Sequence, residues 1–299
     1  MEGSPFQANC QATCVSNDGR VLGGSGGEEG WQARIWTRPG AWQSIAPAWS
    51  HIEDLSPDGT VAVGRHWAED HWRALRWSSG TTEFLPASPE GHRHAEAVAI
   101  APSGDVILGC AFNTHSTVSG RQRYMDSASI TDARPLIFSH DGVQVLPGLE
   151  AGYNWWPFDI SDDGQVIVGL RWPLGEHFHD SIERSSGLAF RWENGQATLL
   201  GTLPGCQHSQ ALTISGDGQT IAGLCFYREQ QNTHAMAFVW DAEHGMRSVA
   251  DVLSQAGANP GGWLLQRGKS LSHDGLSLVG QGKNPQGRSD AWFARLPSE

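Results

Sequence analysis

The chain is built from short runs in which apolar and polar residues alternate, separated by turns of glycine, serine and aspartate. Alternation over four to eight positions predicts β-strands with one buried face. Six times an apolar run is followed by a Ser-x-Asp-Gly turn or a close variant, a second apolar run, and a glycine five residues after the turn glycine. The copies read CVSNDGRVLGG, DLSPDGTVAVG, AIAPSGDVILG, DISDDGQVIVG, TISGDGQTIAG and SLSHDGLSLVG.

Each copy continues with an insert and a third run that ends, in most copies, in a small residue followed by a large aromatic. These runs read QARIW, RALRW, RPLIF, LAFRW, MAFVW and DAWFA. A glycine-containing turn and a fourth run follow in all copies but the last. We interpret the aromatics as packing between neighbouring repeats; they are Trp36, Trp77, Phe138, Trp192 and Trp240.

Four antiparallel strands in a unit that recurs about every 40 to 60 residues predict a radial array. We therefore expect an all-β fold, a six-bladed β-propeller of four-stranded antiparallel blades, with residues 1–299 forming one domain. The sixth copy stops after its third strand, at WFARLPSE. The N-terminal segment SPFQAN is expected to supply the missing outer strand and close the ring, because a closed ring leaves only short strand edges.

The S-x-DG-x-x-x-x-G unit followed by an A-F-x-W unit resembles the HAF-type extracellular repeat, a bacterial family, over residues 10 to 296. That repeat is a structural unit without assigned catalytic residues, so the resemblance implies a fold and little about activity. Members of the family are secreted, whereas the start of this chain, MEGSPFQANC, lacks a basic region and an apolar core. As written, the sequence predicts a cytoplasmic protein, with export of a longer precursor left open.

Charge and composition narrow the classes of partner. A net charge of −12 and a pI near 5.5 argue against nucleic acids and anionic membranes, because both are bound through clustered Lys and Arg. No stretch approaches eighteen apolar residues. Cys10 and Cys14 would lie about 13 Å apart on one strand, beyond disulfide reach, and the odd number of five cysteines fits reduced thiols. We expect a monomer or a weak dimer that binds a small molecule.

Loop length predicts which rim of the propeller carries the site. The Asp-Gly turns and the turns between third and fourth strands share one rim and are short and uniform. The long inserts share the opposite rim, where a rigid scaffold usually carries its binding residues. Ten of the thirteen histidines and many tryptophans are predicted to lie there too. The long inserts are residues 111–133, 172–186, 226–235 and 251–266.

Aligning the innermost strands on the turn gives equivalent positions near the mouth of the channel. One ring contains Gln11, His51, Glu96, Trp156, Gln210 and Arg267, and a second ring, two residues further along, contains Thr13, Glu53, Val98, Phe158, Leu212 and Lys269. A third, outer set includes Trp49, His94 and His208. Structural symmetry would place similar residues in each ring, so the differences between blades indicate a specific site, although Glu53 with Lys269 would equally serve to neutralise the channel.

The favoured chemistry is acid–base catalysis without a metal or other cofactor. His51 is expected to act as a general base oriented by Glu96, with Glu53 nearby and Arg267 or Lys269 stabilising negative charge. Cyclisation, elimination, isomerisation and hydrolysis fit equally well. An apolar substrate would be held by side chains from the same mouth. The substrate-binding residues are expected to be Trp49, His94, Trp155, Trp156, His208, Gln210 and Trp263.

Two alternatives stay open. His51, His94, His208 and Glu96 could converge on a metal ion, since imidazole suits several transition metals, but the histidine spacing is a weak signal. A non-catalytic propeller that binds a glycan or a protein would use the same aromatic rim. The glycines follow β-turn logic rather than that of a phosphate-binding loop, and no Gly-x-Ser-x-Gly nucleophile motif is present. Nucleotide cofactors therefore find no support.

Overall fold

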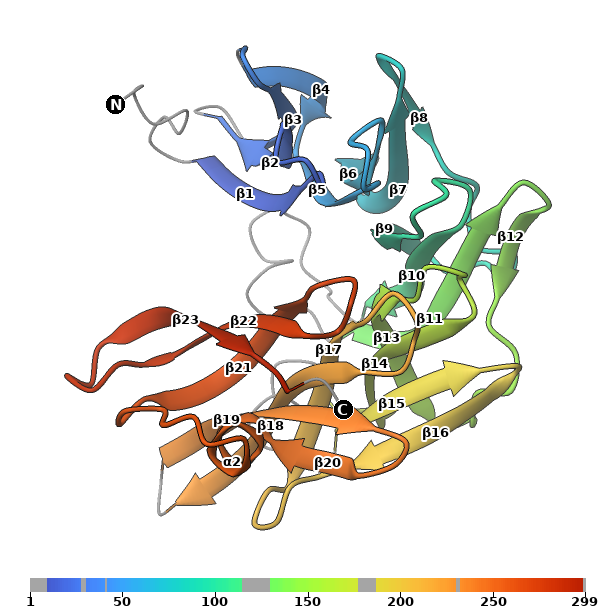
Figure 1. Ribbon diagram of the computed structural model, residues 1–299. Helices are drawn as coiled ribbons and strands as arrows, with labels where there is room; N and C mark the ends of the chain where they lie inside the picture. The colour runs from blue at the N-terminus through green and yellow to red at the C-terminus, as the bar shows by residue number, and fades with distance from the viewer. Residues whose placement is uncertain are drawn as a thin grey trace. The chain divides into compact units, whose positions relative to one another are not determined.

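The structure of the protein is a computed structural model that describes residues 10–27, 31–40, 42–114, 130–176, 187–229 and 232–297. The described residues divide after Leu146 into two compact units, apart from residues 130–132, which group with the second unit. Each unit is described by itself (Figure 1). No helix in the described residues is long and apolar enough to cross a membrane.

The first unit contains three antiparallel sheets of four strands each, every one a meander in chain order. Sheet 1 is β1 (Cys10–Val15), β2 (Val21–Gly26), β3 (Gln32–Thr37) and β4 (Trp42–Ala48). Sheet 2 is β5 (Ser50–Leu55), β6 (Val61–Ala68), β7 (His71–Ser78) and β8 (Thr81–Phe84). Sheet 3 is β9 (His94–Ile100), β10 (Ile107–Thr114), β11 (Ile130–Ser139) and β12 (Gly142–Val145).

The second unit contains two further four-stranded sheets and one of three strands. Sheet 4 is β13 (Tyr153–Ile160), β14 (Val166–Pro173), β15 (Leu188–Glu193) and β16 (Gln196–Gly201). Sheet 5 is β17 (His208–Ile214), β18 (Ile221–Glu229), β19 (Asn232–Asp241) and β20 (Gly245–Ser248), followed by the helix α2 (Val249–Gln255). Sheet 6 is β21 (Leu264–Leu271), β22 (Ser277–Lys283) and β23 (Ser289–Arg295).

These sheets confirm the predicted repeat of antiparallel strands, and two of the predicted long loops are wrong. Residues 226–229 and 232–235 pair in the β18–β19 hairpin, in which Phe226 pairs with Ala235 and Glu229 with Asn232. Residues 251–266 contain most of α2, whose first turn is capped because Asp251 N donates to Ser248 Oγ. The segment SPFQAN, expected to close the ring, lies outside the described residues.

The repeated turn is held by its serine and aspartate. In sheet 2, Ser56 Oγ donates to Asp58 Oδ1 at 2.6 Å and accepts from Val61 N at 2.9 Å. Gly59 takes a left-handed φ of +71°, which glycine adopts without steric cost. The same Ser–Asp hydrogen bond recurs in four other sheets, and sheet 3 has Ala101 and Ser103 at the two positions. The pattern therefore encodes a turn that satisfies its own polar groups.

The second glycine of the repeat marks a β-bulge in the innermost strand. In sheet 2 the ladder shifts register between Ile52 and Asp54, so Glu53 is an extra, unpaired residue. A Cβ built on Gly64 would lie 2.0 Å from the carbonyl oxygen of His51. The same clash, at 2.5 Å or less, occurs at the equivalent glycines of the other five sheets. Glycine recurs there because the bulge turns a carbonyl oxygen against it.

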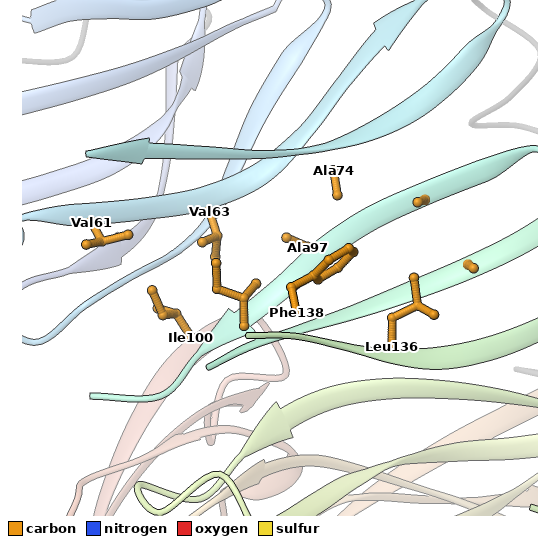
Figure 2. Close-up of a cluster of buried hydrophobic side chains, with 10 residues drawn as sticks. Val61, Val63, Ala74, Ala97, Ile100, Leu136 and Phe138 are labelled. Carbon is orange, nitrogen blue, oxygen red and sulfur yellow. The ribbon is translucent and has the colours of Figure 1, made fainter. Parts of the chain in front are cut away.

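Neighbouring sheets of a unit pack face to face through apolar side chains. Figure 2 shows one such cluster, in which Val61 and Val63 of sheet 2 meet Ala97 and Phe138 of sheet 3. Ala74 and Leu136 belong to the same cluster, and all of its members are buried. Equivalent clusters join sheets 1 and 2, sheets 4 and 5, and sheets 5 and 6. The core of each unit therefore lies between its sheets.

The aromatics of the third strands divide into two kinds. Trp77, Phe138 and Trp240 pack against the clusters between sheets, as predicted. Trp36 and Trp192 instead donate their indole N–H groups to the carbonyl oxygens of Gly40 and Pro147. Rings from the third strand also lie over the repeat glycines in four sheets; they are Phe138, Phe190, Phe238 and Trp292. Of these, only Phe138 stands at the aromatic position of the sequence pattern.

Candidate functional site

The structure places the two predicted rings at equivalent positions of the ladders. Each first-ring residue pairs with the residue that follows a repeat glycine: Gln11 with Ser25, His51 with Arg65 and Glu96 with Cys110 in the first unit, and Trp156 with Leu170, Gln210 with Leu224 and Arg267 with Gln281 in the second. Each second-ring residue is the extra residue of a bulge. These are Thr13, Glu53 and Val98 in the first unit, and Phe158, Leu212 and Lys269 in the second.

In the first unit the bulge of sheet 2 carries an ion-pair network. Arg65 contacts two carboxylates, Glu96 at 2.5 Å and Glu53 at 3.3 Å. Glu96 is buried, with 3% of its side chain exposed, whereas Glu53 keeps 28%. The Arg65 guanidinium also lies 5.1 Å from the ring centre of Trp72, a cation–π distance. Two acids and one cation therefore share the site.

Glu53 is the half-buried acid of this network. Burial raises its pKa, Arg65 opposes that rise, and the neighbouring Glu96 adds to it. A carboxyl group whose pKa is raised holds a proton more readily than an ordinary glutamate does. The bulge matters because it removes Glu53 from the ladder pattern and aims its side chain at Arg65.

His51 lies beside the network but has a different partner from the one expected. Its Nδ1 is 3.1 Å from Ser25 Oγ, and Glu96, expected to orient it, instead accepts from Arg65. Its ring stacks on Trp31 at 5.6 Å. Burial first, and the Arg65 charge second, lower the pKa of His51 to about 4. His51 is therefore neutral at physiological pH.

His94, predicted to bind substrate, is a core residue with 2% exposure. It lies between the rings of Trp67 and Phe112, at 6.1 and 5.1 Å. Its Nδ1 accepts from Trp72 N at 3.2 Å, which places the proton of the neutral ring on Nε2, facing Thr114. Burial lowers its pKa to about 4. These contacts connect sheets 2 and 3, and the role of His94 in substrate binding stays a prediction.

The predicted tryptophans occupy several environments. Trp49 is half-buried, with a left-handed φ of +68°, and its carbonyl oxygen accepts from Trp67 N. Trp155 and Trp156 are 2% and 8% exposed, and Trp155 donates to Glu150 O while meeting Phe190 edge to face. Both side chains are therefore buried, and their role in substrate binding stays a prediction. Trp263 packs against the cluster between sheets 5 and 6.

The remaining predicted residues lie in the second unit. Gln210 is buried on β17, and half-buried His208 precedes it by two residues. Burial lowers the pKa of His208, an effect that Glu176 opposes and Arg228 reinforces. Arg267 and Lys269 lie two residues apart on β21, where burial and the charge of Arg267 lower the pKa of Lys269. In the described residues no group of three or more His, Cys, Asp or Glu side chains could hold a metal ion.

The tight-turn rim, predicted to have short and uniform turns, is held together by hydrogen bonds between sheets. Turns of neighbouring sheets are joined by backbone hydrogen bonds: Asn17 N to Pro57 O in the first unit, and Asp162 N to Gly216 O and Gly216 N to His273 O in the second. A cavity of about 360 Å³ opens between sheets 5 and 6 on this rim. Its lining includes Asp241, Glu243, Arg247, Val252 and Leu276. No sequence pattern indicated this cavity, because its walls come from two sheets and α2.

Arg65 is the residue of the first unit's site that sequence reasoning missed. It carries both acidic contacts, yet it stands on the second strand, outside the aligned innermost strands. A signal was present. Position 65 follows a repeat glycine directly, and the six equivalent residues differ as much as those of the rings: Ser25, Arg65, Cys110, Leu170, Leu224 and Gln281.

Comparison with known proteins identifies the fold. No protein-family model matches the chain, and no curated protein matches it in sequence. Among solved structures it resembles oligogalacturonate lyase from Vibrio parahaemolyticus (TM-score 0.56, 13% identity, 95% of this chain and 76% of the lyase). It also resembles the β-propeller domain of the Trilobed protease from Pyrococcus furiosus (TM-score 0.56, 9% identity, 95% and 82%).

A third similar structure is TolB from Acinetobacter baumannii (TM-score 0.51, 13% identity, 80% of this chain and 53% of TolB). The chain thus spans about half the length of that protein. At identities this low the likeness shows the fold alone, and that fold is an all-β one of the β-propeller kind. The sheets of the two units, each a meander of antiparallel strands, agree with it.

Proposed function

We propose that the chain is an enzyme that acts by acid–base catalysis on a small, partly apolar organic substrate, with Glu53 as the proton-transferring group. The observation that carries the proposal is the setting of Glu53: a bulge position, a raised pKa, and a contact with Arg65 at 3.3 Å. Fixed charge beside a carboxyl of raised pKa is the arrangement that enzymes use to move protons.

The neighbours of Glu53 would have different roles in this reaction. Glu96, buried and hydrogen bonded to Arg65, holds the guanidinium in place. Arg65 can then stabilise negative charge that develops on a substrate when Glu53 removes a proton. Neutral His51, stacked on Trp31, supplies an apolar wall rather than a base. Proton abstraction suits elimination or isomerisation, and the likeness to oligogalacturonate lyase supports an enzyme of this general kind.

The proposal includes the architecture in which the site would work. The six sheets would be the blades of one propeller, closed at β23 by the N-terminal segment, with substrate entering at the rim of the long inserts. The coverage of 95% of the chain by propeller structures supports this arrangement. The hydrogen bonds between neighbouring turns on the opposite rim support it as well, because they join successive sheets within each unit.

Loss of the proton-transferring group tests the proposal. Hydrogen–deuterium exchange into a panel of small carbonyl compounds with acidic C–H groups, followed by NMR in D₂O, detects proton abstraction without requiring a known product. Glu53→Gln should lower the exchange rate by about 10²-fold or more. Glu83→Gln is the matched control, since Glu83 also pairs with an arginine of sheet 2, at 3.0 Å, but on the exposed surface. Exchange that survives in Glu53→Gln contradicts the proposal.

The likeness to TolB also fits an alternative, a non-catalytic propeller that binds a glycan or a protein. Such a protein would need the shape of the site but no proton transfer by Glu53. It predicts that no compound of the panel exchanges and that Glu53→Gln and the native chain behave alike.

A further inference from the structure

Sulfur-bearing side chains gather on one face of sheet 5, in the second unit. The sequence has five cysteines and four methionines. In the described residues, two of each belong to the apolar cluster between sheets 4 and 5; they are Cys206, Cys225, Met236 and Met246. Cys225 pairs with Met236 across the β18–β19 ladder, and Met246 pairs with Trp240 across β19–β20. Because Trp240 follows Met236 by an even number of residues, these strand residues share one face of the sheet.

The sulfur of Cys225 is the centre of this group. Its Sγ donates to Met246 Sδ at 3.3 Å, and its thiol lies within hydrogen-bonding distance of the Cys206 thiol. Cys206 is brought there by the turn at residues 203–206, in which Cys206 N donates to Leu203 O at 3.0 Å. Two sulfurs that bind one metal ion at about 2.3 Å each lie no more than about 4.6 Å apart. The contact between Cys225 and Met246 is within that limit.

A backbone donor also points at the central sulfur. Leu203 N donates to Cys225 Sγ at 3.4 Å. Hydrogen bonds of this kind stabilise the thiolate form, which is the form that binds metal ions. Burial raises the pKa of Cys206 and, to about 12, that of Cys225, so both groups are protonated thiols when no metal ion is bound. A metal ion must therefore displace their protons.

The types of ligand indicate which metal. Zinc sites use cysteine, histidine and carboxylate ligands, whereas thioether sulfur suits a soft ion such as Cu(I). Two thiols and a thioether in mutual contact, with the second thioether of Met236 in the same cluster, are therefore a set of ligands for a soft ion. Cys206 is half-buried, which gives an ion a way in from solvent.

We propose that this sulfur cluster is a binding site for one Cu(I) ion, held by the thiolates of Cys206 and Cys225 and the thioether of Met246. Binding forms three copper–sulfur bonds and releases the two thiol protons to solvent, and copper stays in the same oxidation state. The site lies in the second unit and does not involve Glu53, so it is independent of the proposed function.

Competition with a chelator tests the proposal. The full chain, reduced and kept without oxygen, is titrated with Cu(I) in the presence of bathocuproine disulfonate. One Cu(I) ion should be retained per chain, with an ultraviolet absorption band from thiolate to copper. Cys206→Ser should lower the affinity by about 100-fold or more, since loss of a ligand costs at least as much as loss of an outer partner. Met246→Leu, which conserves side-chain volume, should lower it by about 10-fold or more.

Cys10→Ser is the matched control and should leave the affinity unchanged. Cys10 is half-buried like Cys206 but lies in the first unit, where Arg34 Nη1 donates to its sulfur. Circular dichroism checks that each variant folds, and Ag(I), which cannot be oxidised under these conditions, repeats the titration and should give the same order of affinities. Three results overturn the inference: no Cu(I) retained against the chelator, equal affinities in Cys206→Ser and the unsubstituted chain, or an equal loss in Cys10→Ser.

Discussion

The carbonyl oxygen of His51 lies against Gly64, so close that a Cβ on residue 64 would be 2.0 Å away from it. The contact exists because Glu53 is inserted as an extra residue in β5. The glycine and the acid are therefore two parts of one bulge, and the bulge connects the scaffold to the candidate site.

Gly64→Ala should destabilise the first unit by about 3 kcal/mol or more, since backbone and not a flexible side chain must move. Gly80→Ala is the control. Gly80 has a left-handed φ of +82°, and a Cβ at this position would meet nothing within 4 Å, so only conformational strain, about 1 to 2 kcal/mol, is expected. Urea unfolding measures both. Equal losses would show that the contact with His51 carries no special cost.

Arg65→Met should cost about 3 to 5 kcal/mol of stability, because it leaves buried Glu96 without its cation. Arg65→Met combined with Glu96→Gln should recover part of the loss. Arg76→Met removes an exposed pair with Glu83 and should cost about 1 kcal/mol or less. Chemical denaturation measures the free energy of unfolding of the unsubstituted protein and of the three variants. A double variant no more stable than Arg65→Met alone would contradict the ion-pair network.

Acid should destabilise the first unit through His94. The pKa of this residue is about 4 in the folded chain, against an ordinary value of 6.5 for histidine. Because the folded state resists protonation, the contribution of His94 is fully present above pH 6.5 and is lost as the pH falls toward 4, up to about 3 kcal/mol.

His94→Gln should flatten the pH dependence of the unfolding free energy between pH 7 and pH 4.5. His140→Gln serves as control, because the side chain of His140 is 99% exposed. A His94→Gln slope identical to that of the unsubstituted chain would show that other groups govern the acid response.

Sheet 3 lacks the Ser–Asp hydrogen bond that the other five turns possess. Installing it with Ala101→Ser and Ser103→Asp should stabilise the protein by about 1 kcal/mol, because the new hydroxyl can accept from Val106 N and donate to the new carboxylate. The equivalent bonds in sheet 2 are 2.9 and 2.6 Å long. Thermal unfolding measures the gain, and an unchanged midpoint would mean that this turn has a different geometry.

Local features of the sequence predicted the sheets well. Alternation predicted the strands, the Ser-x-Asp-Gly turn joined the correct pairs, and the aligned ring positions fell at equivalent ladder positions in all six sheets. The insert at residues 226–235 has the pattern of a loop because polar residues interrupt its alternation, yet cross-strand pairing extends the hairpin through it. Sequence periodicity cannot show how far a partner strand reaches.

The site was predicted less completely. Glu53, Lys269 and the other bulge residues were aligned correctly, but the aligned strands excluded Arg65. His94, Trp155 and Trp156, predicted to contact substrate, are buried. Imidazole and indole occur both in cores and in pockets, so residue type does not distinguish the two. Burial depends on packing against a neighbouring sheet, which is distant along the chain.

By itself the sequence determined the strands, their turns and the position of each bulge, because alternation, a self-satisfied Ser–Asp turn and a glycine under a carbonyl oxygen are all interactions within one sheet. The tertiary structure decided which charges meet. Arg65 bridges Glu53 of its own sheet and Glu96 of the next, and His51 is neutral because of the burial that such packing creates. Electrostatic properties arise from groups brought close in space, and only the packing of one sheet on another brings them there.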